Sequence, residues 1–163
     1  MNALSLTPPW GTLVAILAKR FETRSWPLPA ACIGQPLAIH QTKGLAGLGG
    51  EAGYRALLCQ RVFGEALLAG NIRWEDQIPR GAIIAVVIPV ACYRITASGL
   101  SAHGTTRPLP DESERSFGDY APERWAWELA EVQRLATRVA CRGMQGIWVV
   151  PPAVEAQIIA ELA

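Results

Sequence analysis

The sequence predicts one α+β domain that spans residues 1–163, and three observations lead to this class. The chain has 163 residues, which is a normal size for a single domain with its own core. Half of the residues are hydrophobic and 18% are charged, as is typical of globular proteins. Segments with helical spacing of apolar residues are interspersed with short β-like segments, and no linker or internal repeat separates them.

The first predicted helix covers residues 10–18 and leads directly into a strand. Pro8 and Pro9 indicate a helix start, because proline suits the first helical turn. Apolar residues follow at helical spacing, and the basic pair at positions 19 and 20 is expected to close the helix. Residues 21–26 alternate as a strand does. One face of that strand is expected to carry Glu22, Arg24 and Trp26, with Thr23 on the other face.

The middle of the chain is predicted to contain strands and one long helix. Residues 36–40 form a short apolar strand, and a glycine-rich loop covers residues 44–53. Residues 54–69 are predicted as a single helix that ends at a Gly-Asn pair. Residues 82–95 are nearly all apolar and rich in β-branched side chains, which favours either a buried strand pair or one long strand. Pro89 should mark a bulge, bend or edge within this segment.

The last third of the chain contains one segment that is ambiguous between helix and strand. Residues 98–118 are polar and are predicted to form a surface loop. Residues 124–139 fit both periodicities, and their Ala, Glu, Leu and Arg content favours a helix by propensity. Residues 146–150 are predicted as a short strand, and a final helix is expected to begin at the following proline pair and to reach residue 162.

Composition argues against several classes of protein. The formal net charge is +1, so a strongly basic surface for nucleic acid is not expected across the whole chain. The longest apolar run is shorter than the roughly 20 residues that a bilayer requires, and the N-terminus lacks the basic start of a secretory signal. We therefore expect a cytoplasmic protein without a membrane partner. Four widely spaced cysteines and two histidines match no metal-ligand spacing, so neither a metal nor a cofactor is expected.

The densest chemistry lies where the first helix meets the first predicted strand. Lys19 ends the helix, and the strand then carries Glu22 and Arg24 two residues apart. Trp10, at the other end of the helix, and Trp26 could bring aromatic faces close to these charges. Cations beside aromatic rings suit phosphates and stacked bases, whereas a lysine near a carboxylate could transfer protons. The alternative is a solvated helix end with a surface Glu–Arg pair.

Other polar residues offer weaker candidates. Tyr120 could stack a base and Arg124 could hold a phosphate, although a structural turn would explain both residues equally well. The glycine-rich loop lacks the Gly-Lys-Ser/Thr ending of a phosphate-binding loop. His40 ends an apolar strand, which favours a half-buried, hydrogen-bonded histidine over a ligand contact.

The helix–strand junction resembles the signature of the ASCH domain family, within the PUA-like superfamily. The family's motif is G-x-K-x-x-E-x-R, and residues 17–24 read LAKRFETR. Lysine, glutamate and arginine match, while Leu17 stands where the glycine is usual. ALSLTPPW upstream resembles the family's opening strand and helix start, with Pro8 where a glutamine is common. PRGAII, FGDYAPERWAWEL and CRGMQGIWVVPP resemble its later strands, so the likeness covers most of the chain.

The resemblance implies a small PUA-like β-barrel with flanking helices and a cleft beside the motif. It also implies that residues 124–135 are mainly strand, against their propensity. If the usual glycine permits a tight approach or unusual dihedral angles, the leucine at position 17 should give the cleft a different shape from that of the family.

The resemblance also implies three functions: nucleic-acid binding, hydrolysis of acetylated cytidine, and ribonuclease activity. In the amidohydrolase relatives a threonine nucleophile stands beside the lysine, and this chain has Glu22 at that position. We therefore expect a nucleic-acid-binding module, for RNA or a modified nucleoside. The expected binding residues are Trp10, Lys19, Glu22, Arg24, Trp26, Tyr120 and Arg124. The alternative is a small hydrolase for an acylated nucleoside, or a ribonuclease, with Lys19 and Glu22 as catalytic residues.

Overall fold

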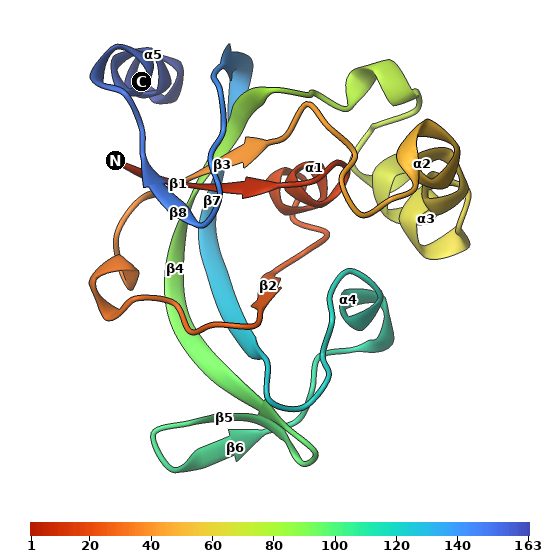
Figure 1. Cartoon of the computed structure of the whole chain (residues 1–163), viewed down its shortest axis with the longest axis vertical. Helices are drawn as coiled ribbons and strands as arrows, with labels where there is room; N and C mark the ends of the chain where they lie inside the picture. Colours follow the sequence, from red (N-terminus) through yellow and green to blue (C-terminus); the bar gives the residue numbers. More distant parts are fainter.

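One curved sheet of eight strands organises the chain, and the computed structural model describes all of residues 1–163 (Figure 1). The six strands of its main path are ordered β2-β7-β4-β3-β1-β8, and the hairpin β5–β6 extends from the end of β4. β1 and β3 are parallel, and every other pair is antiparallel. The strands are β1 Asn2–Leu6, β2 Phe21–Arg24, β3 Leu37–Gln41, β4 Ala82–Thr96, β5 Gly99–Ala102, β6 Thr105–Arg107, β7 Trp125–Ala140 and β8 Ile147–Val149.

Five helices and two short 3₁₀ turns complete the α+β architecture. They are α1 Trp10–Ala15, η1 Ala30–Cys32, α2 Gly50–Leu58, α3 Arg61–Ala69, η2 Glu75–Gln77, α4 Glu112–Ser116 and α5 Pro152–Leu162. α2 and α3 lie together at one side of the molecule, and α5 packs against β7 at another (Figure 1). None of the helices combines the length and the apolar character that crossing a bilayer requires.

The two longest strands, β4 and β7, pair at the centre of the sheet, and three register shifts interrupt their pairing. One of these lies between Pro89 and Ala91, so the predicted bulge at Pro89 is confirmed. The strand form of β7 is also confirmed over the helix that its propensity favours. Its side chains alternate into the core at Trp127, Leu129 and Leu135, so packing decides its structure.

The expected β-barrel is wrong in one respect, because the sheet is not closed. β2 and β8 stand at the two ends of the strand order and do not pair with each other. Each is short, with four and three residues respectively. α1 instead contacts β1, β3, β4 and β7 from the concave side, and Val14 packs with Leu4, Ile39 and Trp127 in the main core.

Two predicted segments contain more secondary-structure elements than the sequence indicated. The single helix expected over residues 54–69 is two helices, because the backbone of Gln60 is extended (ψ 135°) and breaks the helical path. The polar loop expected over residues 98–118 contains the β5–β6 hairpin and α4. Asp111 caps α4 by accepting a hydrogen bond from the Glu114 amide at 2.9 Å, so local polar contacts build that helix.

α1 is fixed on the sheet by a buried polar contact. The Gln41 side chain of β3 accepts from the Thr12 amide at 2.7 Å and donates to the Thr12 hydroxyl at 3.0 Å. A Cβ on Gly11 would approach the Gln41 oxygen to 2.8 Å, so glycine permits this close packing. This contact therefore fixes the position of α1 relative to β3, and with it the place where residues 17–24 begin.

The end of α1 is a Schellman turn that a leucine occupies. The amides of Leu17 and Ala18 donate to the carbonyls of Val14 and Leu13, which is the pairing of that motif. Leu17 has φ 65° and its side chain is 65% exposed. The left-handed backbone that glycine favours is therefore present at this position, and leucine adopts it at a steric penalty.

Replacement of Leu17 by glycine should stabilise the protein. We expect Leu17→Gly to raise the free energy of unfolding by about 1 kcal/mol, because glycine adopts a positive φ without the Cβ penalty. Leu17→Ala keeps the Cβ and removes the same exposed side chain, so it should leave stability nearly unchanged. Urea unfolding of the three proteins measures the difference. Equal stability of Leu17→Gly and Leu17→Ala would contradict strain at this turn.

Candidate functional site

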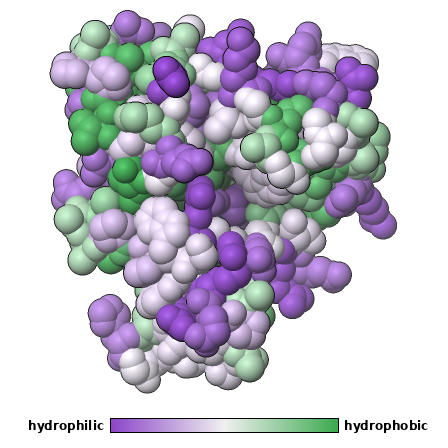
Figure 2. All heavy atoms as spheres, viewed as in Figure 1, coloured by the Kyte–Doolittle hydropathy of each residue, from purple (hydrophilic) through white to green (hydrophobic).

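An open cavity of about 490 Å³ lies where the end of β1, α1, β2 and the segment after α4 come together. We call it the Lys19 cavity. Figure 2 shows hydrophilic residues gathered around a hollow near the middle of one face of the molecule. The cavity is lined by Ser5, Leu6, Thr7, Trp10, Lys19, Glu22, Thr23, Arg24, Ser25, Trp26, Ser116, Phe117, Gly118, Asp119 and Arg124.

Lys19 reaches this cavity because the Schellman turn directs the chain back across the end of α1. Its amide donates to the carbonyl of Leu13 at 3.0 Å, which holds the residue against the helix. The side chain is only 1% exposed. Its ammonium donates to the Phe21 carbonyl and lies 3.4 Å from the Glu22 carboxylate. An ammonium has three donors, so one N–H remains for a ligand in the cavity.

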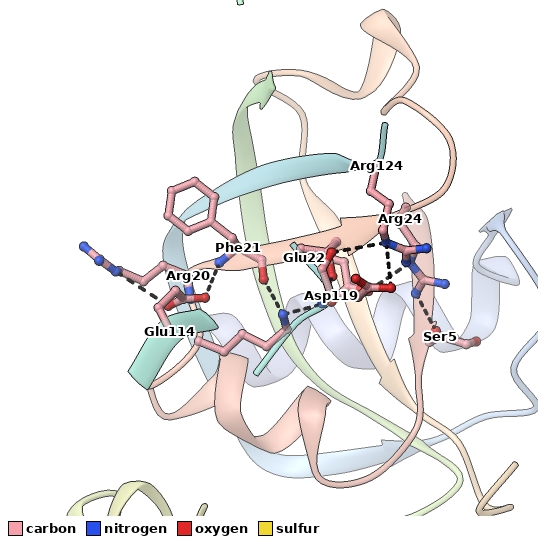
Figure 3. A network of polar contacts seen from close by, with 10 residues as sticks. Ser5, Arg20, Phe21, Glu22, Arg24, Glu114, Asp119 and Arg124 are labelled. Carbon is pink, nitrogen blue, oxygen red and sulfur yellow. Dashed lines mark hydrogen bonds and ion pairs between the residues drawn. The ribbon is translucent and has the colours of Figure 1, made fainter. Parts of the chain in front are cut away.

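Glu22 is shared between two cations. One of its oxygens faces the Lys19 ammonium, and the other lies 2.9 Å from Nε of Arg24. The Arg24 guanidinium also donates to the Ser5 carbonyl at 3.2 Å, which connects β2 to the end of β1 (Figure 3). This Lys19–Glu22–Arg24 network therefore ties three elements together at the base of the cavity.

Glu114 of α4 holds the start of β2 in place. Its buried carboxylate accepts from the amides of Arg20 and Phe21 at 2.8 and 3.0 Å (Figure 3). The next segment of chain closes over β2, where the Asp119 amide donates to the Thr23 hydroxyl at 2.9 Å. Thr23 also lines the cavity, although alternation placed it on the opposite face of the strand from Glu22.

Trp10 and Trp26 are both half-buried and line the cavity. The Trp10 and Phe63 rings form a T-shaped pair with their centroids 6.2 Å apart, and the Trp26 and Trp127 rings form another at 4.7 Å. These contacts restrict each ring while leaving part of it accessible. The most exposed tryptophan is Trp74, at 71%, and it lies outside this cavity.

Arg124 lines the cavity and Tyr120 does not. Nε of Arg124 lies 3.2 Å from the carboxylate of Asp119 and also donates to its carbonyl. The Tyr120 hydroxyl is buried without a hydrogen-bond partner. Burial, together with the nearby carboxylates of Glu114 and Glu22, raises the pKa of Tyr120 well above its ordinary value of 10.0. The structure therefore brings together the expected site residues with the exception of Tyr120.

The sequence did not indicate Ser5 or Glu114 as parts of this site. Ser5 contributes through its backbone carbonyl, which leaves no side-chain signal. Glu114 lies in a polar stretch without apolar periodicity, and only the capping residue Asp111 three positions earlier marks a helix start there. No three His, Cys, Asp or Glu side chains gather in a group that could hold a metal ion.

Comparison with solved structures identifies the fold. No family model matches the sequence, and no curated protein matches it. The ASCH protein of Zymomonas mobilis matches with a TM-score of 0.52 and 13% identity, over 98% of this chain and 93% of that chain. A tyrosine-to-phenylalanine mutant of that protein matches with a TM-score of 0.53 and 13% identity, over 98% of this chain and 96% of that chain. A serine-to-alanine mutant matches with a TM-score of 0.53 and 13% identity, over 99% of this chain and 96% of that chain.

The chain has an ASCH fold. The likeness extends over nearly the whole of both chains. Within this ASCH fold, the segment that resembles the family motif, residues 17–24, forms the turn after α1 and the whole of β2. Its lysine, glutamate and arginine are the three members of the buried ion network, and its usual glycine position has the left-handed backbone of Leu17.

Neutralising the central carboxylate of the Lys19–Glu22–Arg24 network should destabilise the protein strongly. We expect Glu22→Gln to lower the free energy of unfolding by about 3 kcal/mol, because it leaves the buried Lys19 ammonium without its counterion. The matched control is Glu123→Gln, which breaks an exposed ion pair with Arg94 and should change stability little. Urea unfolding measures both variants. Similar, small losses in the two would contradict a structural role for the network.

Proposed function

We propose that the chain binds RNA or a modified nucleoside through the Lys19 cavity. The observation that carries this proposal is the buried Lys19–Glu22–Arg24 network beside two restrained, partly accessible tryptophan rings. Unpaired bases are recognised by aromatic stacking combined with hydrogen bonds to their edges. The volume of about 490 Å³ lies within the usual range for sites that take small organic groups.

The polar groups of the cavity suit the edge of a base. The free N–H of Lys19 is a donor, and the Glu22 carboxylate is an acceptor with fixed orientation, because its two oxygens face cations on opposite sides. Both groups are nearly buried, so hydrogen bonds that they make to a base edge are shielded from bulk water and are stronger than on an exposed surface. Such a pair favours a ligand edge that offers an acceptor beside a donor.

The charge of the chain favours short ligands over long ones. Arg24 and Arg124 line the cavity, but each is paired with a carboxylate, and the formal net charge is only +1. Because nonspecific affinity for nucleic acid arises from neutralised phosphates, we expect weak binding to long duplexes. Affinity should come mainly from stacking and edge contacts within the cavity.

Replacement of one rim tryptophan should weaken RNA binding. We expect Trp26→Leu to reduce affinity for a short single-stranded RNA about tenfold, since stacking on an aromatic ring contributes about 1–3 kcal/mol per base. Trp74→Leu removes an exposed tryptophan outside the cavity and should leave affinity unchanged. Fluorescence anisotropy with labelled RNA measures both variants, and melting temperatures confirm that each is folded. Equal affinities of Trp26→Leu and the wild type would contradict the proposal.

A second candidate is hydrolysis of an acylated nucleoside or of RNA, and one distance favours it. Nζ of Lys19 and Oε2 of Glu22 lie 3.4 Å apart beside the cavity, close enough to act on one substrate. Glu22 would accept a proton from an attacking water, and Lys19 would stabilise the negative charge that develops on the substrate oxygen. For N4-acetylcytidine, water would add to the acetyl carbon, and Glu22 would pass the proton to N4 as the C–N bond breaks, which releases cytidine and acetate.

Turnover assays separate this hydrolase from the binding module. If the chain only binds, N4-acetylcytidine and short RNA should remain intact after prolonged incubation with the wild-type protein. Chromatography of the products measures this directly. Release of cytidine or of RNA fragments by the wild type, and not by Lys19→Met, would establish the hydrolase and overturn binding as the sole activity.

A further inference from the structure

A second cavity lies against the Lys19 cavity and shares two of its residues. It has a volume of about 810 Å³, and Ser5 and Arg24 line both cavities. We call it the Lys43 cavity. Its remaining walls come from the end of β3, from the start of the glycine-rich loop, from the turn before β4 and from the loop between β7 and β8. They consist of His40, Thr42, Lys43, Ala46, Gly81, Cys141, Arg142, Gly143, Met144, Gln145 and Gly146.

The Lys43 cavity is lined by cations without carboxylates. Arg24, Lys43 and Arg142 contribute three positive side chains, and no Asp or Glu is among the lining residues. Lys43 and Arg142 are exposed and form no ion pair, in contrast to Arg24 and Arg124 of the Lys19 cavity. Two unpaired cations across one cavity create a local positive potential in a chain whose formal net charge is only +1.

A series of hydrogen bonds that links Trp148, Ser5, His40 and Cys141 supports one wall of the Lys43 cavity. The Trp148 indole donates to the Ser5 hydroxyl at 3.1 Å, and Nδ1 of His40 lies 3.1 Å from that hydroxyl. Nε2 of His40 lies 3.1 Å from the Cys141 carbonyl, which only accepts, so Nε2 carries the proton and Nδ1 accepts from Ser5. Burial lowers the pKa of His40 from its ordinary value, which favours the neutral ring.

This support also fixes the loop that carries Arg142. A Cβ on Gly143 would collide with the His40 ring and would come within 2.7 Å of the Ser5 hydroxyl, so the loop backbone lies directly on these two side chains. Arg142 is therefore attached to a restrained backbone, although its side chain is exposed. The cations of the Lys43 cavity are held on three separate segments that face one space.

We propose that the Lys43 cavity is a phosphate subsite for the ligand whose base occupies the Lys19 cavity. Arg24 stands between the two, with Nε toward Glu22 and a terminal nitrogen toward the Ser5 carbonyl. A phosphate on the Lys43 side would meet Lys43 and Arg142, while the base remains on the Lys19 side. The ligand is then a nucleotide or a strand of RNA, and a free nucleoside lacks the second contact. This inference rests on the proposed function of the Lys19 cavity.

The test compares each of the four ribonucleosides with its 5′- and 3′-monophosphates and with a dinucleoside phosphate. Titrations followed by amide and indole NMR signals give a dissociation constant for each ligand. We expect at least one phosphorylated form to bind about tenfold more tightly than its nucleoside, and to shift the amides of Arg142 and Gly143. The monophosphates and the dinucleoside phosphate separate a terminal phosphate from one within a strand.

The decisive variant is Lys43→Ala combined with Arg142→Ala. It should remove the advantage of the phosphate and leave nucleoside affinity unchanged, because neither residue lines the Lys19 cavity. The matched control is Arg73→Ala with Arg134→Ala, two exposed and unpaired arginines outside both cavities, and it should behave as the wild type.

Two results would overturn the inference, and they differ in their consequence. If nucleosides or RNA bind in the Lys19 cavity and the phosphate adds no affinity in any form, the phosphate subsite is wrong while the proposed function stands. If neither nucleosides, nucleotides nor short RNA bind, both proposals fail. A phosphate advantage that survives in the Lys43→Ala, Arg142→Ala variant would also reject the Lys43 cavity as its source.

Discussion

The carboxylate of Glu22 holds two cations on opposite sides, and the geometry around the Lys19 cavity depends on that contact. Lys19 comes from the turn after α1, and Arg24 extends from the end of β2 to the Ser5 carbonyl of β1. A nearly buried lysine is tolerated only with a partner, because removing its charge from water is costly. The same carboxylate therefore fixes where three elements meet and presents the polar groups of the cavity.

The structure around this network explains why Lys19 and Glu22 are nearly buried and do not form an ion pair on the surface. The Schellman turn at Leu17 directs the chain so that Lys19 lines the cavity. The Glu114 carboxylate accepts hydrogen bonds from the amides of Arg20 and Phe21 at the start of β2. Trp10 and Trp26 lie beside the network, and each ring makes a T-shaped contact with another aromatic ring. Charge, restraint and aromatic surface are thus combined in one place of a chain with almost no net charge.

Local patterns in the sequence predicted the start of α1, the strand β2 and the bulge at Pro89, since each depends on neighbouring residues. The strand form of β7 was predicted only from the family resemblance. Its conformation depends on packing between β2 and β4, which are distant in the sequence. The break at Gln60, the helix that carries Glu114 and the open sheet were missed. The helix that carries Glu114 depends on a short polar cap, and the open sheet depends on pairing between distant segments; apolar periodicity reveals neither. The break at Gln60 has no side-chain cap that could mark it in the sequence.

The central claim is that the Lys19 cavity is the binding site, and NMR of the whole chain with short single-stranded RNA tests it most directly. All six tryptophans have indole N–H signals, so the rim is observed separately from the rest of the surface. The account predicts that the Trp10 and Trp26 indoles shift with the amides of β2 and Gly118, while the exposed Trp74 indole stays in place. Shifts centred on Trp74, or none at the rim under saturating RNA, would contradict it.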